Sequence, residues 1–244
     1  MKLLKSTLLV TLLISLFSCK NQKETKTSAE NFLIIDTLNV TAPFGNYNIQ
    51  TPDFKNAPQF LITDFGAEQT DQDKTSKAIA TAIDSAHARN GGTVVIPKGE
   101  WLTSKIHFKS HVNLHLEEGA TLLFSENPQD YLPAVLSTWE GMECYNYSPL
   151  IYAYDCENVA ITGKGKLKAK MDTWKVWFAR PSGHMQNLKQ LYEMASKDVP
   201  VEERQMVNDS ANFRPQFIQF NRCKKVLLEG ISIENSPFWV IHPY

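Results

Sequence analysis

Histidines and acidic residues are the first candidates for metal or acid–base chemistry in this chain. His107, His111 and His115 recur every four residues. That spacing gathers side chains on one face only in a helix, whereas this segment alternates apolar and polar residues as a strand does. Asp155 and Glu157 flank a cysteine in an expected turn, which is a poor position for a catalytic pair. The sequence therefore predicts no bound metal and no cofactor.

Three cysteines lie in the body of the chain. Cys144, Cys156 and Cys223 show no C-x-x-C spacing of the kind that binds zinc. Their number is odd, and a disulfide is permitted outside the cytoplasm but not implied. We expect Cys156 and Cys223 to be small core residues.

The N-terminus has the pattern of a secretory signal. Lys2 and Lys5 precede the apolar run from Leu8 to Leu16, and the segment Leu-Phe-Ser-Cys ends at Cys19. This ending resembles a bacterial lipobox, in which the cysteine is lipidated. We expect residues 1–18 to be removed and Cys19 to anchor the protein to the outer membrane, on its periplasmic or surface face. An ordinary signal peptide cut nearby is the alternative.

The bulk composition fits one large domain. The chain has 244 residues, 43% of them hydrophobic, and a net charge of −1. Without a basic surface, nucleic acid is not an expected partner. Residues 19–60 include three prolines and are expected to be a tether followed by an irregular segment with at most one edge strand, and residues 61–244 to be the folded domain.

The elements of that domain are one helix and many short strands. Ile79, Ala82, Ile83 and Ala86 form a single apolar stripe, which predicts a helix over 75–90, capped by Asp73 or Thr75 and ended by Gly91-Gly92. Strands are expected at 94–96, 106–108, 112–116, 121–124, 151–154, 159–161, 217–220, 226–228, 231–233 and 238–241.

An internal repeat indicates how the strands stack. Residues 156–163 match residues 223–230 at an offset of 67, and residues 110–119 are a looser third copy. Each copy is a turn, an alternating strand and a glycine, and such units bury their apolar face only by stacking. A doubly wound sheet would need a helix between strands. The sequence therefore predicts an all-β right-handed parallel β-helix, with the helix capping its N-terminal end.

Residues 170–214 interrupt the repeat. Helices are expected near 185–195 and over 201–207. In solenoids, long insertions gather on one face and often shape a binding cleft, and a packing flange is the alternative.

The sequence motifs resemble glycoside hydrolase family 28, the polygalacturonases. The resemblance rests on Asp64-Phe-Gly-Ala67, residues 91–99, residues 112–123, Arg214-Pro-x-Phe-Ile-Gln-Phe220 and Asn235-Ser-Pro-Phe-Trp-Val-Ile-His-Pro243. The resemblance implies a pectin-lyase-like parallel β-helix. It also implies hydrolysis of α-1,4-linked galacturonate in pectin with inversion, by one carboxylic acid and one carboxylate base. The family supplies these from Asn-x-Asp and Asp-Asp motifs that follow the last segment, and the chain contains no Asp-Asp pair. We therefore expect a portion of the enzyme that ends before its catalytic residues and is inactive alone.

Five side chains are candidates for binding a uronide substrate. Arg214 and Arg180 could bind sugar carboxylates, Trp239 could stack on a sugar, and His242 and His184 could bond hydroxyls or carboxylates. Surface ion pairing for the arginines and core packing for Trp239 are the plain alternatives. The expected partner is pectin or galacturonan, bound by a monomer whose only membrane contact is the lipid anchor. A rhamnogalacturonan or other uronide hydrolase, and a non-catalytic glycan-binding β-helix, remain alternatives.

Overall fold

The structure, a computed structural model, describes residues 34–244. The expected signal peptide, the lipidation residue Cys19 and part of the expected tether lie outside this range. No helix within the described range is long and apolar enough to cross a membrane.

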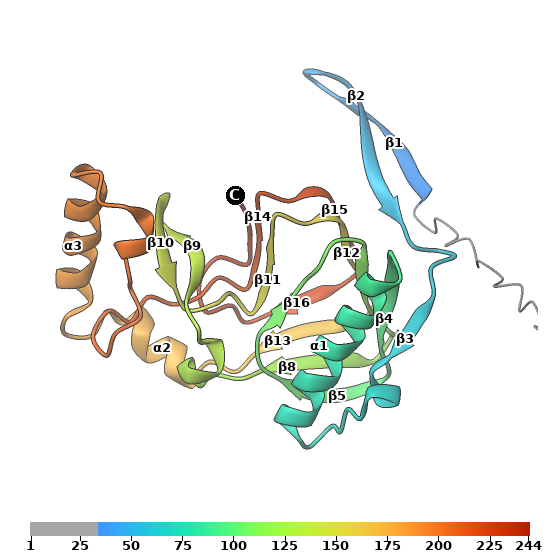
Figure 1. Cartoon of the computed structure of the whole chain (residues 1–244), viewed down its shortest axis with the longest axis horizontal. Coiled ribbons are helices and arrows are strands. Elements are labelled where there is room, and N and C mark those ends of the chain that lie inside the picture. The colour runs from blue at the N-terminus through green and yellow to red at the C-terminus, as the bar shows by residue number, and fades with distance from the viewer. Residues whose placement is uncertain (1–33) are drawn as a thin grey trace, which may run out of the picture. The chain divides into compact units, whose positions relative to one another are not determined.

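Three parallel sheets wind residues 59–243 into a β-helix (Figure 1). The β3 sheet contains β3 (Gln59–Leu61), β4 (Gly92–Ile96), β7 (Val112–Leu116), β12 (Glu157–Gly163) and β15 (Lys224–Glu229). The β5 sheet contains β5 (Gly99–Thr103), β8 (Ala120–Phe124), β13 (Lys166–Ala169) and β16 (Ser232–Glu234). The β6 sheet contains β6 (Ile106–His107), β11 (Ile151–Tyr154), β14 (Ile218–Asn221) and β17 (Ile241–Pro243). The predicted parallel β-helix is confirmed, although β3, β5 and β13 were not among the expected strands. The strand expected at 238–241 is formed instead by β17, at Ile241–Pro243.

The predicted repeat stacks one copy on the next. Ile161 of β12 pairs with Leu228 of β15 on one side and with Leu114 of β7 on the other, and Leu114 pairs in turn with Val94 of β4. Val94, Leu114 and Ile161 are fully buried. Because each such side chain contributes about 1.5–3 kcal/mol when it leaves water, this inward column holds the coils together.

The helix α1 (Gln72–Ala88) packs its apolar stripe against the first coil, as predicted. Its N-cap is Asp71, whose side chain accepts a hydrogen bond from the Lys74 amide at 3.0 Å. The expected caps were therefore wrong. Thr75 lies inside the helix, where its buried hydroxyl donates instead to the Glu68 carbonyl at 2.6 Å. A short 3-10 helix, η1 (Ile62–Phe65), precedes α1.

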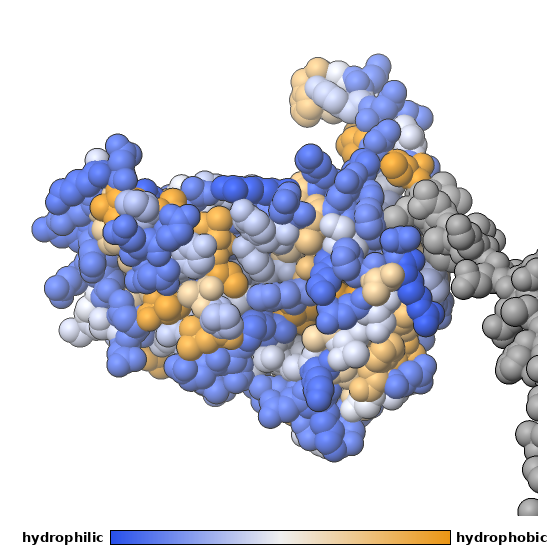
Figure 2. All heavy atoms as spheres, viewed as in Figure 1, coloured by the Kyte–Doolittle hydropathy of each residue, from blue (hydrophilic) through white to orange (hydrophobic). Residues whose placement is uncertain are grey.

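A β-hairpin precedes the β-helix and corrects the expectation of an irregular segment with at most one edge strand. The strands β1 (Ile34–Ala42) and β2 (Gly45–Asp53) pair antiparallel along their whole length. Leu38, Tyr47 and Ile49 remain about half exposed, and Phe44 at the tip is 81% exposed. Figure 2 shows the hairpin projecting from the surface with an apolar tip.

A second hairpin and the expected insert form a side structure with its own small core. After η2 (Pro128–Tyr131), β9 (Val135–Trp139) and β10 (Met142–Asn146) make an antiparallel hairpin that the sequence did not predict. The insert contributes α2 (Asp172–Phe178), also unpredicted, α3 (His184–Ser196), which confirms the expected helix, and η3 (Val201–Glu203), which is shorter than expected. The buried cluster that joins hairpin and insert consists of Trp139, Cys144, Leu188, Leu191, Met206, Ala211 and Phe213.

Candidate functional site

A row of polar side chains runs across the outer face of the β6 sheet. His107, Tyr152, Gln219 and His242 occupy the same register position on four successive strands. The rings of His107 and Tyr152 lie 5.4 Å apart, and Gln219 Nε2 donates to Nδ1 of His242 at 3.2 Å. Parallel stacking at identical positions therefore builds a continuous polar ladder from residues that are far apart in the sequence.

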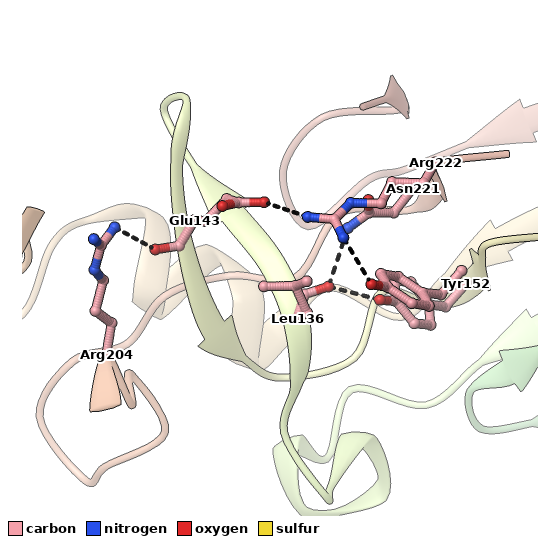
Figure 3. Close-up of polar contacts among 7 residues, drawn as sticks. Leu136, Glu143, Tyr152, Arg204, Asn221 and Arg222 are labelled. Carbon is pink, nitrogen blue, oxygen red and sulfur yellow. Dashed lines mark hydrogen bonds and ion pairs between the residues drawn. The ribbon is translucent and has the colours of Figure 1, made fainter. Parts of the chain in front are cut away.

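The β9–β10 hairpin is fixed across part of this ladder. Tyr152 Oη donates to the Leu136 carbonyl at 2.7 Å (Figure 3). Ser137 Oγ donates to Gln219 Oε1 at 2.8 Å. Asn221 Nδ2 reaches the same Leu136 carbonyl at 3.4 Å. The hairpin covers these rungs of the ladder, whereas β17 carries no such cover among the described residues.

Arg222 lies beside the hairpin at the edge of the same face. Its Nη2 is 3.2 Å from Glu143 Oε1 of β10 (Figure 3). Its Nη1 donates to Tyr154 Oη at 3.0 Å. The Arg222 side chain is 55% exposed, so these partners orient the guanidinium without removing it from water. An exposed, oriented guanidinium is suited to bidentate binding of a carboxylate.

Three aromatic rings form the surface at β17. Trp239 is 53% exposed and its ring lies 6.2 Å from that of His242, which in turn stacks on Tyr244 at 6.2 Å. The Trp239 amide donates to Gln216 Oε1 at 3.1 Å, which fixes the backbone beneath the indole. Partial burial lowers the pKa of His242, so the ring is neutral at pH 7 and offers hydrogen bonds rather than charge.

Comparison with known proteins relates this geometry to a family, although no family model matches the chain. An exopolygalacturonase from Thermotoga maritima, described as hyperthermoactive, superposes with a TM-score of 0.74 and 40% sequence identity, over 80% of this chain and 45% of that structure. A probable polygalacturonase from Vitis vinifera is 25% identical over 190 residues, which are 75% of this chain and 33% of the relative. An exo-poly-α-D-galacturonosidase from Dickeya chrysanthemi is 31% identical over 112 residues, 43% of this chain and 18% of the relative.

The chain resembles the polygalacturonases of glycoside hydrolase family 28. It spans about a third of the Vitis relative and less than half of the Thermotoga structure.

In this polygalacturonase-like chain, the five predicted binding residues occupy different surroundings. Trp239 and His242 lie side by side on the outer face of the β-helix. Arg214 is half-buried between the rings of Phe178 and Phe238, at 4.7 and 4.8 Å, and donates to the Pro237 carbonyl at 2.6 Å.

Neither remaining candidate lies in the polar ladder of this polygalacturonase-like chain. The exposed Arg180 has Met185 Sδ 3.8 Å from its Nη1. His184 is 1% exposed, with its Nδ1 2.8 Å from the Ala211 carbonyl and its ring packed against Trp139 and Phe213. Its side chain therefore packs in the small core of the insert rather than facing solvent.

Sequence reasoning about the family missed Tyr152, Gln219, Arg222 and Glu143. The repeat could have indicated Tyr152 and Gln219, because both stand four residues before the equivalent cysteines Cys156 and Cys223. Nothing in the sequence connected Glu143 with Arg222, since their contact depends on the unpredicted hairpin. The described residues contain no group of three or more acidic, histidine or cysteine side chains placed to hold a metal ion.

Proposed function

We propose that the whole protein hydrolyses α-1,4-galacturonosidic bonds in pectin or galacturonan, and that the outer face of the β6 sheet binds the polymer. The observation that carries this proposal is the combination of the exposed Arg222 and the Trp239–His242 surface on one face of a chain 40% identical to an exopolygalacturonase. An arginine recognises the carboxylate that each galacturonate carries, and an exposed indole provides an apolar face for the sugar ring.

The hairpin supports action at a chain end. A polymer that enters over β17 and follows the ladder toward β6 meets the β9–β10 hairpin, which Tyr152 and Gln219 hold against the sheet. In this position the hairpin blocks one end of the binding face, so a terminal sugar can bind there but a polymer that extends past it cannot. This arrangement favours release of small uronides from polymer ends.

Inverting hydrolysis requires a carboxylic acid and a carboxylate base, and we identify neither among residues 34–244. We propose that the 244-residue chain contributes part of the binding face and that the acid and base belong to further coils of the longer protein. The chain alone should therefore bind oligogalacturonides without turning them over.

Calorimetric titration of the 244-residue chain with trigalacturonate tests the binding half of this proposal. Arg222→Gln should weaken binding about 2- to 5-fold, the range expected for one exposed charge pair. Arg89→Gln is the matched control, because Arg89 lies over Phe60 at the first coil. Equal affinities in wild type and Arg222→Gln would remove Arg222 from the site, and robust hydrolysis of polygalacturonate by the chain would contradict the placement of the carboxylates.

We also propose that the protein is exported, lipidated at Cys19 and anchored in the outer membrane as a monomer. The support is the basic start, the apolar run and the Leu-Phe-Ser-Cys ending of residues 1–19. Cys19→Ala should move the protein from the membrane fraction to the soluble fraction, whereas Cys144→Ala should not. Persistence of Cys19→Ala in the membrane fraction would refute the anchor, and elution of the delipidated protein as a dimer would refute the monomer.

A further inference from the structure

Two cysteines occupy equivalent positions on neighbouring coils. Cys156 directly precedes β12 and Cys223 directly precedes β15, and the pairing of these strands begins with Glu157 beside Lys224. The Lys224 amide donates to the Cys156 carbonyl at 2.9 Å, so the backbone ladder extends through the cysteines themselves. Adjacent strands are about 4.8 Å apart, which lies inside the range of about 4.4–6.8 Å between the Cα atoms of disulfide-bonded cysteines.

The backbone around the two cysteines repeats as well. The residues before them, Asp155 and Arg222, have φ of 50° and 56°. The residues two positions after them, Asn158 and Lys225, have φ of 55° and 54°. Two turns with matching left-handed residues on both sides superpose, so the cysteine side chains leave the backbone in the same direction. Their Cβ atoms are then about one strand spacing apart, about 4.8 Å, and must approach to about 3.5–4.5 Å when a disulfide forms.

The sulfur contacts confirm that the thiols share a direction. Each Sγ approaches the carbonyl two residues earlier in its own coil, Tyr154 at 3.3 Å for Cys156 and Asn221 at 3.4 Å for Cys223. Each also approaches an equivalent carbonyl one coil earlier, Phe108 at 3.6 Å and Ala153 at 3.5 Å. The two thiols are hydrogen-bond partners, and this contact lowers the pKa of Cys156 while it raises the pKa of Cys223.

Burial differs along the pair. Cys156 is 7% exposed, whereas Cys223, on the next coil, is partly exposed. The third cysteine, Cys144, is buried in the small core of the insert, and burial raises the pKa of its thiol to about 12. Among the three described cysteines, only Cys156 and Cys223 have thiols in contact with each other.

We propose that Cys156 and Cys223 form a disulfide that links two neighbouring coils and closes a loop around the whole insert. The oxidant is a small-molecule or protein disulfide of the compartment outside the cytoplasm, so formation in the cell rests on the proposed export. With glutathione disulfide, one cysteine thiolate attacks a glutathione sulfur and releases one glutathione thiolate. The second cysteine thiolate then attacks the mixed disulfide, forms the Sγ–Sγ bond and releases the second glutathione. Two protein thiols are oxidised and one glutathione disulfide is reduced to two thiols.

The test uses the purified 244-residue chain and is independent of its location and its activity. After incubation with glutathione disulfide, the protein is unfolded, its free thiols are alkylated, and its peptides are analysed by mass spectrometry. We expect a linked peptide pair containing Cys156 and Cys223, with Cys144 alkylated. Oxidised protein should melt about 5–10 °C above reduced protein, because a cross-link around a long loop restricts the unfolded chain.

Matched variants identify the pair. Cys144→Ala should keep both the linked peptide and the difference in Tm, whereas Cys156→Ser and Cys223→Ser should lose both. The proposal is overturned if Cys156 and Cys223 remain alkylated in oxidised wild type, if glutathione stays attached to either of them, or if Cys144 appears in the cross-link.

Discussion

At the scale of single residues, two tryptophans illustrate how the same side chain serves packing or binding. Trp139 is 1% exposed and stacks between Phe213 and Phe238, with both ring separations at 4.4 Å, whereas Trp239 is 53% exposed. We expect Trp139→Ala to lower the free energy of unfolding by about 3–5 kcal/mol, because it leaves a cavity between two rings. Trp239→Ala should change it by under about 1 kcal/mol while weakening trigalacturonate binding. Urea denaturation measures the free energy of unfolding of both variants, and titration measures their trigalacturonate affinity. A large loss of stability in Trp239→Ala with little loss in Trp139→Ala would contradict these assignments.

His184 gives the protein a pH dependence at the same scale. Burial lowers the pKa of His184, and its Nε2 has no partner among the described residues. The unfolded chain therefore takes up a proton near the ordinary pKa of about 6.5 while the folded ring stays neutral, so stability falls as the pH drops below that value. His107, His111 and His242 also have lowered pKa values and add to the same slope.

Denaturation at pH 7.5 and 5.5 separates the part that His184 contributes. His184→Phe should show a smaller loss of stability between these pH values than wild type, although its stability at pH 7.5 is also lower because the Ala211 carbonyl loses its partner. An unchanged slope in the variant would assign the pH dependence to the other histidines.

At the scale of elements, the glycine that closes each repeat sets how closely coils approach. Gly163 has φ of 109°, and a Cβ at this position would collide with the Leu116 carbonyl of the previous coil. Gly66 also has a positive φ, of 86°, but a Cβ there would meet nothing within 4 Å. Gly66→Ala should therefore cost only the left-handed strain of about 1–2 kcal/mol, and Gly163→Ala clearly more. Thermal melting of both variants compares the two effects, and equal costs would show that the coils can separate without penalty.

Elements also show why the sequence predicted some features and not others. The strand β7 and the repeat of β12 and β15 were predictable because alternation and a closing glycine are local patterns. The β9–β10 hairpin was not, because its charged Glu143 faces Arg222 and its fixing bonds come from Tyr152 and Gln219, which are distant in sequence. The burial of His184 was likewise invisible, since Trp139 and Phe213 reach it from separate segments.

At the scale of the whole molecule, charge predicts how the proposed polyanionic substrate is attracted. The net charge of the 244-residue chain is −1, so no overall field draws galacturonan to this chain. Attraction must come from local pairs such as Arg222 with a sugar carboxylate, on a side chain that is 55% exposed. Salt screens exposed pairs over about 8 Å at physiological ionic strength, so trigalacturonate binding should weaken several-fold between about 0.05 and 0.5 M salt.

The contribution of Arg222 to this dependence can be isolated. Arg222→Gln should bind trigalacturonate with a flatter salt dependence than wild type, whereas Arg89→Gln should keep the wild-type dependence. Neutral galactotriose should bind weakly and independently of salt, because it offers hydroxyls to the ladder and no carboxylate to the guanidinium. If trigalacturonate affinity depends on salt in the same way for wild type and Arg222→Gln, another cationic side chain binds the substrate carboxylates. The half-buried Arg214, which lies between Phe178 and Phe238, would then be the next arginine to substitute.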